Sequence, residues 1–202
     1  MLFYSSLGIL LLVLGASAFG GRSFGIGSLE TTSRLAELAR RIFLIAVVFV
    51  FSYTVYLSFA QYRAWLENEL SKFLLPSYQG WGYFLFYAGM RFFAPYLLSL
   101  AIAGIIFYGM KTVNRRYGER FFYDEEYWFA ALAIFLSGHP GWLVYLTALL
   151  LVYLLIHLYS LFIIHDSDRI SFYYLWLPTG IFAILFIEFY LAKLPFWKLL
   201  AI

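Results

Sequence analysis

The chain has 202 residues, of which 64% are hydrophobic and only 12% charged, and its mean hydropathy is +0.83. Soluble domains are about half apolar and about a quarter charged, so this composition excludes an ordinary globular domain and a disordered chain. A membrane-crossing helix needs roughly 20 apolar residues, so five or six crossings would occupy most of the length. The composition therefore predicts an all-α, polytopic integral membrane protein with one transmembrane domain over residues 1–202.

Cysteine is absent, and the three histidines are His139, His157 and His165. The absence of cysteine excludes disulfides, thiolate metal sites and a cysteine nucleophile. The formal net charge of +3 is spread over the predicted loops, with no basic run that would indicate nucleic-acid binding. We therefore expect no cofactor and no nucleic-acid partner. The expected partners are the lipid bilayer and other membrane proteins.

The first two spans are predicted over residues 2–20 and 42–60. Secretory signal peptides begin with a positive segment, and residues 1–6 carry no Lys or Arg. Arg22 follows the first apolar stretch instead. This pattern favours a retained helix whose N-terminus lies outside the cytoplasm.

The segment 61–75 has an amphipathic pattern. Its apolar side chains, Trp65, Leu66, Leu70, Phe73 and Leu74, lie opposite the charged Arg63, Glu67, Glu69 and Lys72. Such a pattern is typical of a helix that lies in the membrane interface, and Pro76 would end it. We therefore predict an interfacial helix over 61–75.

The remaining predicted spans cover residues 82–110, 124–138, 142–164 and 171–192. The first of them is long and is interrupted by Arg91 and Pro95, so it either tilts strongly or begins as an interfacial segment. The stretch 124–138 is short. Its acidic start is favoured by the helix dipole, and the run Gly138-His139-Pro140-Gly141 would end it. Whether this stretch crosses the membrane or re-enters stays open.

Charge bias predicts the orientation, because Lys and Arg are retained on the cytoplasmic side. With six spans and an outside N-terminus, the loops 22–41 and 111–123 are cytoplasmic, and nine Lys or Arg residues face the cytoplasm against four outside. If 124–138 re-enters the membrane instead of crossing it, the last two spans run in the opposite directions. Ten Lys or Arg residues then face the cytoplasm against three outside, so the charge distribution does not decide between the two arrangements. We expect a multi-pass protein of the cytoplasmic (inner) membrane with about six spans.

Arg91 and Glu188 are the ionisable residues that we expect within the hydrocarbon. Charged groups are costly there and usually pair or line a wet cavity. In the six-span arrangement both lie in the outer half of the bilayer, so an ion pair between them is allowed. The open interpretations are a structural pair, snorkelling to the outer surface, and a substrate or proton path that also includes His157.

His157 and His165 are the candidate metal ligands. They are eight residues apart, which places them about 80° apart around a helix. Asp166 and Asp168 would add carboxylates, although the sequence has neither an HxxxH nor an HExxH spacing. An ordinary hydrophilic loop over 165–168 is the alternative.

Asp124 and Glu125 are the candidate catalytic acids, and Glu126 follows them. In the six-span arrangement they share the cytoplasmic face with the loop that contains His165. Paired carboxylates at a membrane face can perform general acid/base chemistry, whereas helix capping and solvation are the alternative explanation. The sequence contains no serine elbow, P-loop or dinucleotide-binding fingerprint.

A series of short segments carries a resemblance to a known family. In chain order they are Arg115-Arg116-Tyr117-Gly118, Tyr123-Asp124-Glu125-Glu126, Ala130-Ala131-Leu132, Phe135-Leu136-Ser137-Gly138 and Ile170-Ser171-Phe172-Tyr173. With them, residues 115–200 resemble the C-terminal half of the prepilin peptidases, which are GxGD-type aspartyl proteases of the inner membrane. The resemblance implies a helical membrane peptidase in which Asp124 opens the catalytic helix.

The sequence departs from that family at its catalytic motif. Phe121 or Phe122 and Tyr123 replace the two motif glycines, and Tyr108-Gly109-Met110-Lys111 has no acid where the family has its other aspartate. Aspartyl proteases need two carboxyl groups that share a proton. We therefore predict a non-catalytic subunit or assembly factor of a larger membrane complex. A diverged prepilin-peptidase-like protease and a small solute or proton transporter are the alternatives.

Overall fold

The computed structural model describes residues 2–19, 29–118, 120–164 and 172–200. Helices make up all the regular structure of these residues, which contain no strand. The α-helices are α1 (Leu2–Phe19), α2 (Leu29–Glu67), α3 (Pro76–Gln79), α4 (Trp81–Ala88), α5 (Ala94–Arg116), α6 (Asp124–Ser137), α7 (Gly141–Tyr159), α8 (Trp176–Phe189) and α9 (Pro195–Leu200). Short 3-10 helices are η2 (Ser71–Leu74), η5 (Phe172–Tyr174) and η6 (Leu191–Lys193), and π-helical turns are η3 (Gly89–Phe93) and η4 (Ser160–Ile164).

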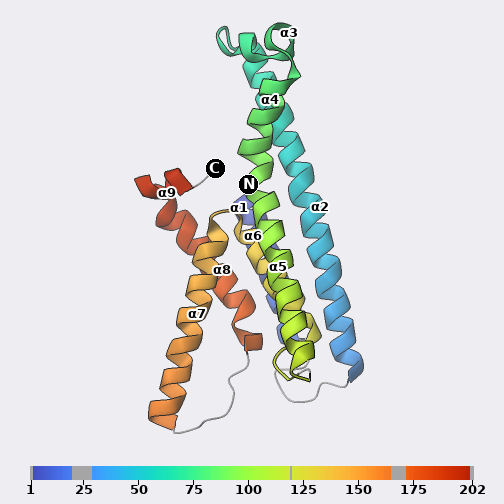
Figure 1. The fold of residues 1–202 in the computed structure, drawn as a ribbon, viewed down its shortest axis with the longest axis vertical. Helices are drawn as coiled ribbons and strands as arrows, with labels where there is room; N and C mark the ends of the chain where they lie inside the picture. The colour runs from blue at the N-terminus through green and yellow to red at the C-terminus, as the bar shows by residue number, and fades with distance from the viewer. Residues whose placement is uncertain (1, 20–28, 119, 165–171, 201–202) are drawn as a thin grey trace.

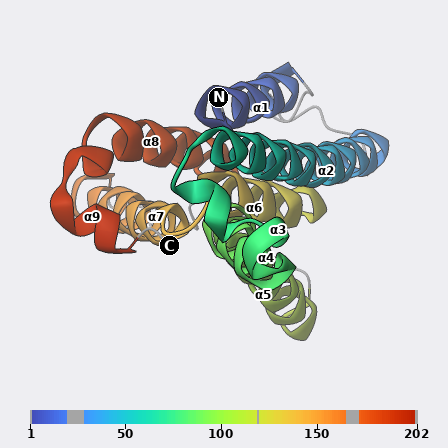
Figure 2. The same cartoon turned by 90° about the horizontal axis from the view of Figure 1, so that it is seen from above.

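The long helices run up and down along one axis, and α6 lies at their centre (Figure 1). It packs against α1, α2, α5, α7 and α8, which surround it when the molecule is viewed from above (Figure 2). Every residue from Glu125 to Leu136 is buried except Trp128, which is partly buried. A helix that is apolar on all sides is expected to be buried, and α6 fits that rule.

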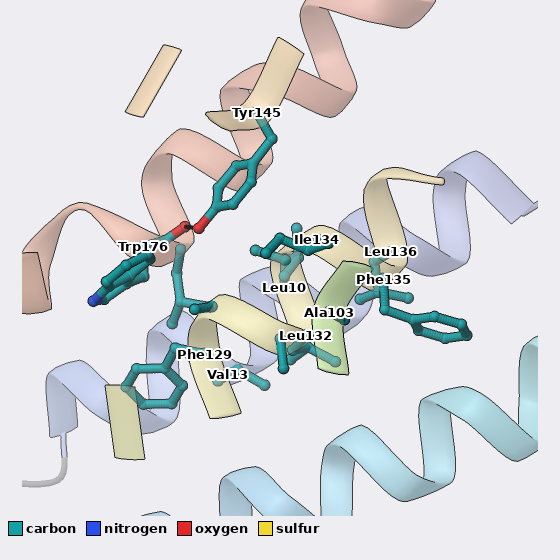
Figure 3. Packing of buried hydrophobic residues seen from close by; sticks show 14 of the residues in the cluster. Leu10, Val13, Ala103, Phe129, Leu132, Ile134, Phe135, Leu136, Tyr145 and Trp176 are labelled. Atoms are coloured by element: carbon teal, nitrogen blue, oxygen red, sulfur yellow. Dashed lines mark hydrogen bonds between the residues drawn. The ribbon is translucent and has the colours of Figure 1, made fainter. Parts of the chain in front are cut away.

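Close packing around α6 combines small and aromatic side chains. Leu10 and Val13 of α1 belong to the same buried cluster as Phe129 and Leu132 of α6 (Figure 3). Aromatic rings from α2 and α5 also contact α6, with Phe43–Trp128 centroids 5.7 Å apart, Phe51–Phe135 6.4 Å and Phe107–Trp128 4.6 Å. Such ring pairs stabilise a fold beyond the apolar area that they bury.

Gly180 of α8 lies close to α6 and α1. A Cβ atom at position 180 would lie 3.0 Å from the Cβ of Ala133 and 3.4 Å from Leu10 Cδ1. These distances are tighter than ordinary van der Waals contacts, so any larger side chain would push α8 away from α6 and α1. The glycine is therefore a packing residue of the bundle.

The prediction of a separate interfacial helix over 61–75 is wrong. Residues 61–67 continue α2, and only 71–74 form a short 3-10 helix before α3. No Gly or Pro interrupts α2 before Asn68, whose Oδ1 accepts hydrogen bonds from the backbone N–H groups of Leu70 and Ser71, each 3.0 Å long. The chain therefore turns at Asn68, and the amphipathic pattern belongs to the end of a long helix.

The predicted span 42–60 lies within the longer α2, Leu29–Glu67, so residues 29–41 of the predicted loop 22–41 are helical instead. The other predicted spans correspond to helices with similar bounds. The stretch 82–110 is divided into α4, η3 and α5, because Pro95 cannot donate a backbone hydrogen bond and the helix widens into a π-turn just before it. The stretch 124–138 is α6, which ends at Gly138 with a φ of 65°. Positive φ is accessible to glycine at little cost, so Gly138 suits this turn.

Four helical segments are long and apolar enough to cross a membrane. They are Arg34–Glu67, Trp81–Arg116, Gly141–Phe162 and Phe172–Lys193. The apolar part of α1, Phe3–Ser17, is shorter, and the 14 residues of α6 extend only about 21 Å. The prediction of an all-α protein is thus confirmed, and four of the six predicted spans correspond to helices that are long and apolar enough to cross a membrane.

Candidate functional site

A buried polar cluster lies where α5 ends and α6 and α8 begin, at the lower end of the bundle in Figure 1. Its members in the described chain are Asn114, Glu125, Glu126, Tyr127, Tyr173 and Trp176, all of them buried. Burying a polar group costs free energy unless the group is hydrogen-bonded. We therefore expect hydrogen bonds to fix the positions of the side chains in this cluster.

Asn114 organises the connection between α5 and α6. Its Nδ2 donates to the backbone oxygen of Phe122 over 2.8 Å and to the hydroxyl of Tyr127 over 2.6 Å. Its Oδ1 accepts from the backbone N–H groups of Phe121 and Phe122 at 2.8 and 3.1 Å. One amide therefore folds the connection back against the last turn of α5 and ties it to α6.

Glu126 joins the start of α6 to α8. Its Oε1 accepts a hydrogen bond from the backbone N–H of Tyr123 over 3.1 Å, which caps the helix. Its Oε2 accepts from Nε1 of Trp176 over 2.8 Å. The carboxylate also lies at the positive end of the α6 dipole. These interactions offset the free-energy cost of burying the carboxyl group of Glu126, whose side chain has no exposed surface.

The two candidate catalytic acids lie in different environments. Asp124 is exposed, whereas Glu125 is 0% exposed. Asp124 is the only aspartate within the described residues, because Asp166 and Asp168 lie outside them. The described part of the chain thus does not bring two aspartates together, and the resemblance to aspartyl proteases gains no support from this geometry.

Aromatic rings cover the cluster. Trp176 stacks on Phe172 with centroids 5.5 Å apart, and Phe172 stacks on Tyr153 of α7 at 4.1 Å. The Tyr145 hydroxyl points at the backbone of Trp176 and donates to its carbonyl oxygen over 3.3 Å (Figure 3). The surrounding aromatic rings lower the local dielectric constant, which strengthens the hydrogen bonds of the cluster. The cluster therefore holds α5, α6 and α8 together.

The histidines do not form a metal site in the described chain. His157 is exposed on α7 and stacks on Tyr153 with an interplanar angle of 3°, while His165 lies outside the described residues. His139 accepts a hydrogen bond from Trp142 Nε1 at its Nδ1 over 3.2 Å. Within the described ranges, no group of three or more His, Asp or Glu side chains could hold a metal ion.

Arg91 and Glu188 do not form an ion pair. Arg91 lies in the π-turn η3 and Glu188 near the end of α8, and both are exposed. By contrast, Glu37 pairs with Arg40 and Arg41 on α2, at 3.5 and 3.0 Å. The two residues that could have paired thus lie on different helical segments, each exposed.

The sequence reasoning missed Asn114 and Trp176. An isolated amide near the end of an apolar helix is a usable signal, because such a group needs hydrogen-bond partners when it is buried. Trp176 carried no comparable signal, since its partner Glu126 is 50 residues away in sequence.

Comparisons with known proteins do not add a family to this description. No protein-family model matches the chain, and neither a curated protein nor a solved structure matches it.

Proposed function

We propose that this chain is a non-catalytic, multi-pass membrane protein that serves as a subunit or assembly factor of a larger membrane complex. The observation that carries this proposal is the hairpin formed by the end of α2, the turn with η2 and α3, and α4. It extends beyond the ends of α6, α7 and α8 (Figure 1). We call residues 66–81 the hairpin tip.

The hairpin tip exposes large apolar side chains. The exposed fractions are 55% for Leu66, 82% for Leu70, 52% for Phe73, 64% for Tyr78 and 59% for Trp81. Clustered exposed apolar residues commonly mark interaction sites, and aromatic residues are enriched at the centres of protein interfaces. The tip therefore has the composition of a surface that another protein covers.

A small core of its own supports the tip. Leu75, Phe84 and Ala88 are 1%, 5% and 4% exposed and form a second cluster separate from the bundle core. Tyr62 stacks on Trp81 with centroids 6.2 Å apart, and Trp65 contacts Phe84 at 5.7 Å. A surface that is rigid before binding loses less conformational entropy when a partner docks.

We further propose six crossings in the cytoplasmic (inner) membrane. The path of the chain supports this number, because α1, α5 and α7 run toward one end of the bundle and α2, α6 and α8 toward the other (Figure 1). Exposed basic residues gather at the lower end, where α5 ends at Arg115 and Arg116. By the positive-inside rule that end is cytoplasmic, so the N-terminus and the hairpin tip are outside.

The peptidase and transporter alternatives have weaker support. For the peptidase, Asp124 is exposed and Glu125 is buried. For the transporter, Arg91, His157 and Glu188 are each exposed on a different helical segment. By contrast, the exposed apolar side chains of the hairpin tip all lie within one segment, residues 66–81.

The test is affinity purification of the tagged chain from its native membrane in mild detergent, followed by quantitative mass spectrometry. We expect a membrane or envelope protein to co-purify at constant ratio with the wild type. The double variant Leu70→Gln/Phe73→Gln should lose it, and the matched variant Leu194→Gln/Phe196→Gln, which changes exposed apolar residues outside the tip, should retain it. A clean monomer or homo-oligomer, or a partner retained by the tip variant, would contradict the proposal. Pilin precursors that appear only transiently would favour the peptidase.

A further inference from the structure

The hairpin and the helical bundle have separate hydrophobic cores. The bundle core extends along α2 as far as Phe51, and along α5 it begins at Tyr96. We call residues 62–92 the hairpin arm, which extends beyond the ends of α6, α7 and α8 (Figure 1). The side chains of its own core are Leu75, Phe84 and Ala88, against which Tyr62, Trp65 and Phe92 pack. The boundary between the two cores therefore crosses both helices of the hairpin.

The helix that returns from the arm is irregular at this boundary. The segment Gly89–Phe93 is π-helical, and the backbone N–H of Ala94 donates to the carbonyl oxygen of Gly89, which is five residues back instead of four. Pro95 follows. Because proline has no N–H, it cannot donate the α-helical hydrogen bond to the carbonyl oxygen of Arg91. Helices bend most often at π-turns and prolines, and both features lie here within seven residues, 89–95.

The other helix of the hairpin, α2, has two polar side chains at the same level. Phe51 of α2 stacks on Phe93 with centroids 6.3 Å apart, which places this part of α2 beside the π-turn. The Thr54 hydroxyl donates to the carbonyl oxygen of Phe51 over 2.8 Å, and the Ser58 hydroxyl donates to that of Thr54 over 2.9 Å. Ser and Thr hydroxyls that bond to the preceding turn often bend a helix. Both helices of the hairpin therefore carry bending features where the two cores meet.

We propose that residues 51–58 and 89–95 form a hinge about which the hairpin arm rotates as one body relative to the bundle. Thr54 is the only buried residue between positions 52 and 61, and no residue of 89–95 is buried. Segments with few buried contacts rearrange at low free energy, whereas the core of the arm keeps its two helices together. From Thr54 to Glu67, α2 extends about 20 Å, so a rotation of about 15° would move the hairpin tip by about 5 Å.

The hinge is independent of the proposed subunit role, and the purified chain tests it without any partner. Because the sequence contains no cysteine, pairs of cysteines at exposed positions can be spin-labelled and their distance distributions measured by double electron–electron resonance. Ser77→Cys with Thr147→Cys on α7 crosses the hinge. Thr112→Cys with Thr147→Cys lies within the bundle, and Arg63→Cys with Ser77→Cys lies within the arm. We expect the pair across the hinge to give a distribution about twice as wide as those of the two reference pairs.

Gly89→Ala in the hinge should narrow the distribution across it, because alanine favours a regular helix over glycine. A Cβ atom at Gly89 would meet no atom within 4 Å, so the change adds no clash. Gly104→Ala is the matched control, since Gly104 is also partly buried and equally free of neighbours but lies in α5 away from the hinge. Pro95→Ala restores a backbone donor and should also narrow the distribution, which provides a second variant if Gly89→Ala does not fold. Circular dichroism and elution volume check folding.

Any of three results would overturn the hinge. The first is a distribution across the hinge that is no wider than those of the two reference pairs. The second is equal narrowing by Gly89→Ala and Gly104→Ala, because it would reflect general stiffening of the helix. The third is a distribution within the arm as wide as the one across the hinge, which would show that the arm itself opens instead of rotating as one body.

Discussion

The indole nitrogen of Trp176 donates a hydrogen bond to the carboxylate of Glu126 over 2.8 Å, and the two side chains are 4% and 0% exposed. This contact joins the first turn of α8 to the first turn of α6, the helix around which the bundle is built. Because the other oxygen of the same carboxylate caps α6, the start of the central helix and its position against α8 depend on one side chain.

We therefore expect Glu126→Gln to destabilise the protein by about 1–3 kcal/mol. The backbone N–H of Tyr123 and the indole N–H of Trp176 both donate a hydrogen bond to the carboxylate of Glu126. A glutamine amide has a single acceptor oxygen, so it can satisfy one partner and must present its NH₂ group to the other. Thermal unfolding of the purified variant in detergent, followed by circular dichroism, measures the loss.

A double-mutant cycle isolates the contact. Trp176→Phe removes the indole donor, so Glu126→Gln combined with it should cost less than the sum of the two single changes. Asp124→Asn is the matched control, because it removes a carboxylate from an exposed position on the same turn. Strict additivity in the cycle, or an equal loss in Asp124→Asn, would show that the Glu126–Trp176 contact does not stabilise the bundle.

Asn114→Leu should loosen the connection between α5 and α6. The change leaves the backbone N–H groups of Phe121 and Phe122 without the side-chain oxygen that they donate to. The free energy needed to open this connection locally should fall by about 2 kcal/mol, which raises the population of the open form more than tenfold. Limited trypsin digestion measures this opening, since Arg115, Arg116 and Arg120 are exposed beside the connection.

Two further variants of α5 serve as an intermediate case and a control for that experiment. Asn114→Asp keeps the acceptor but loses the donor to Phe122 and Tyr127, so its cleavage rate should lie between those of wild type and Asn114→Leu. Thr112→Val changes an exposed polar residue two positions earlier and should be cleaved as the wild type is. Equal cleavage of all four proteins would exclude the anchoring role of Asn114.

Gly180 and Gly109 should respond in opposite ways to alanine. A Cβ at Gly180 would lie 3.0 Å from Ala133 Cβ, so Gly180→Ala should destabilise the bundle, and Gly180→Val should cost about 1–3 kcal/mol. Gly109 is exposed in α5, and a Cβ added there would meet no atom within 4 Å, so Gly109→Ala should be neutral or stabilising by up to about 1 kcal/mol. Melting temperatures compare them, and a loss of equal size in both alanine variants would contradict the packing role of Gly180.

The ends of a helix could be predicted from the sequence where capping or helix-breaking residues are present. The acidic start at Asp124 and the break at Gly138 predicted α6 almost to the residue. The prediction of a separate helix over 61–75 was wrong, because an amphipathic pattern has the same period in a separate helix and at the end of a long one. Only the turn at Asn68, formed by side-chain to backbone hydrogen bonds, distinguishes them.

The candidate site was less predictable, because it depends on how distant helices meet. The sequence places Glu125 and Glu126 at the start of a helix but does not show that both are buried. Likewise, the pairing of Arg91 with Glu188 depends on the rotation of α8, which apolar residues on every side of that helix leave undetermined. Long-range contacts such as Glu126–Trp176 come from tertiary packing and have no local sequence pattern.

The proposed six crossings can be tested by labelling with a membrane-impermeant maleimide, because the chain contains no cysteine. Single cysteines would be introduced at the exposed positions Ser77 in the hairpin tip, Arg120 before α6, and Lys193 after α8. Six crossings place Ser77→Cys and Lys193→Cys outside, so both should be labelled in intact cells, whereas Arg120→Cys should react only after the membrane is permeabilised. Labelling of all three after permeabilisation is the control for accessibility. If Lys193→Cys instead behaves like Arg120→Cys, α6 re-enters the membrane without crossing it and the last two spans have the opposite direction.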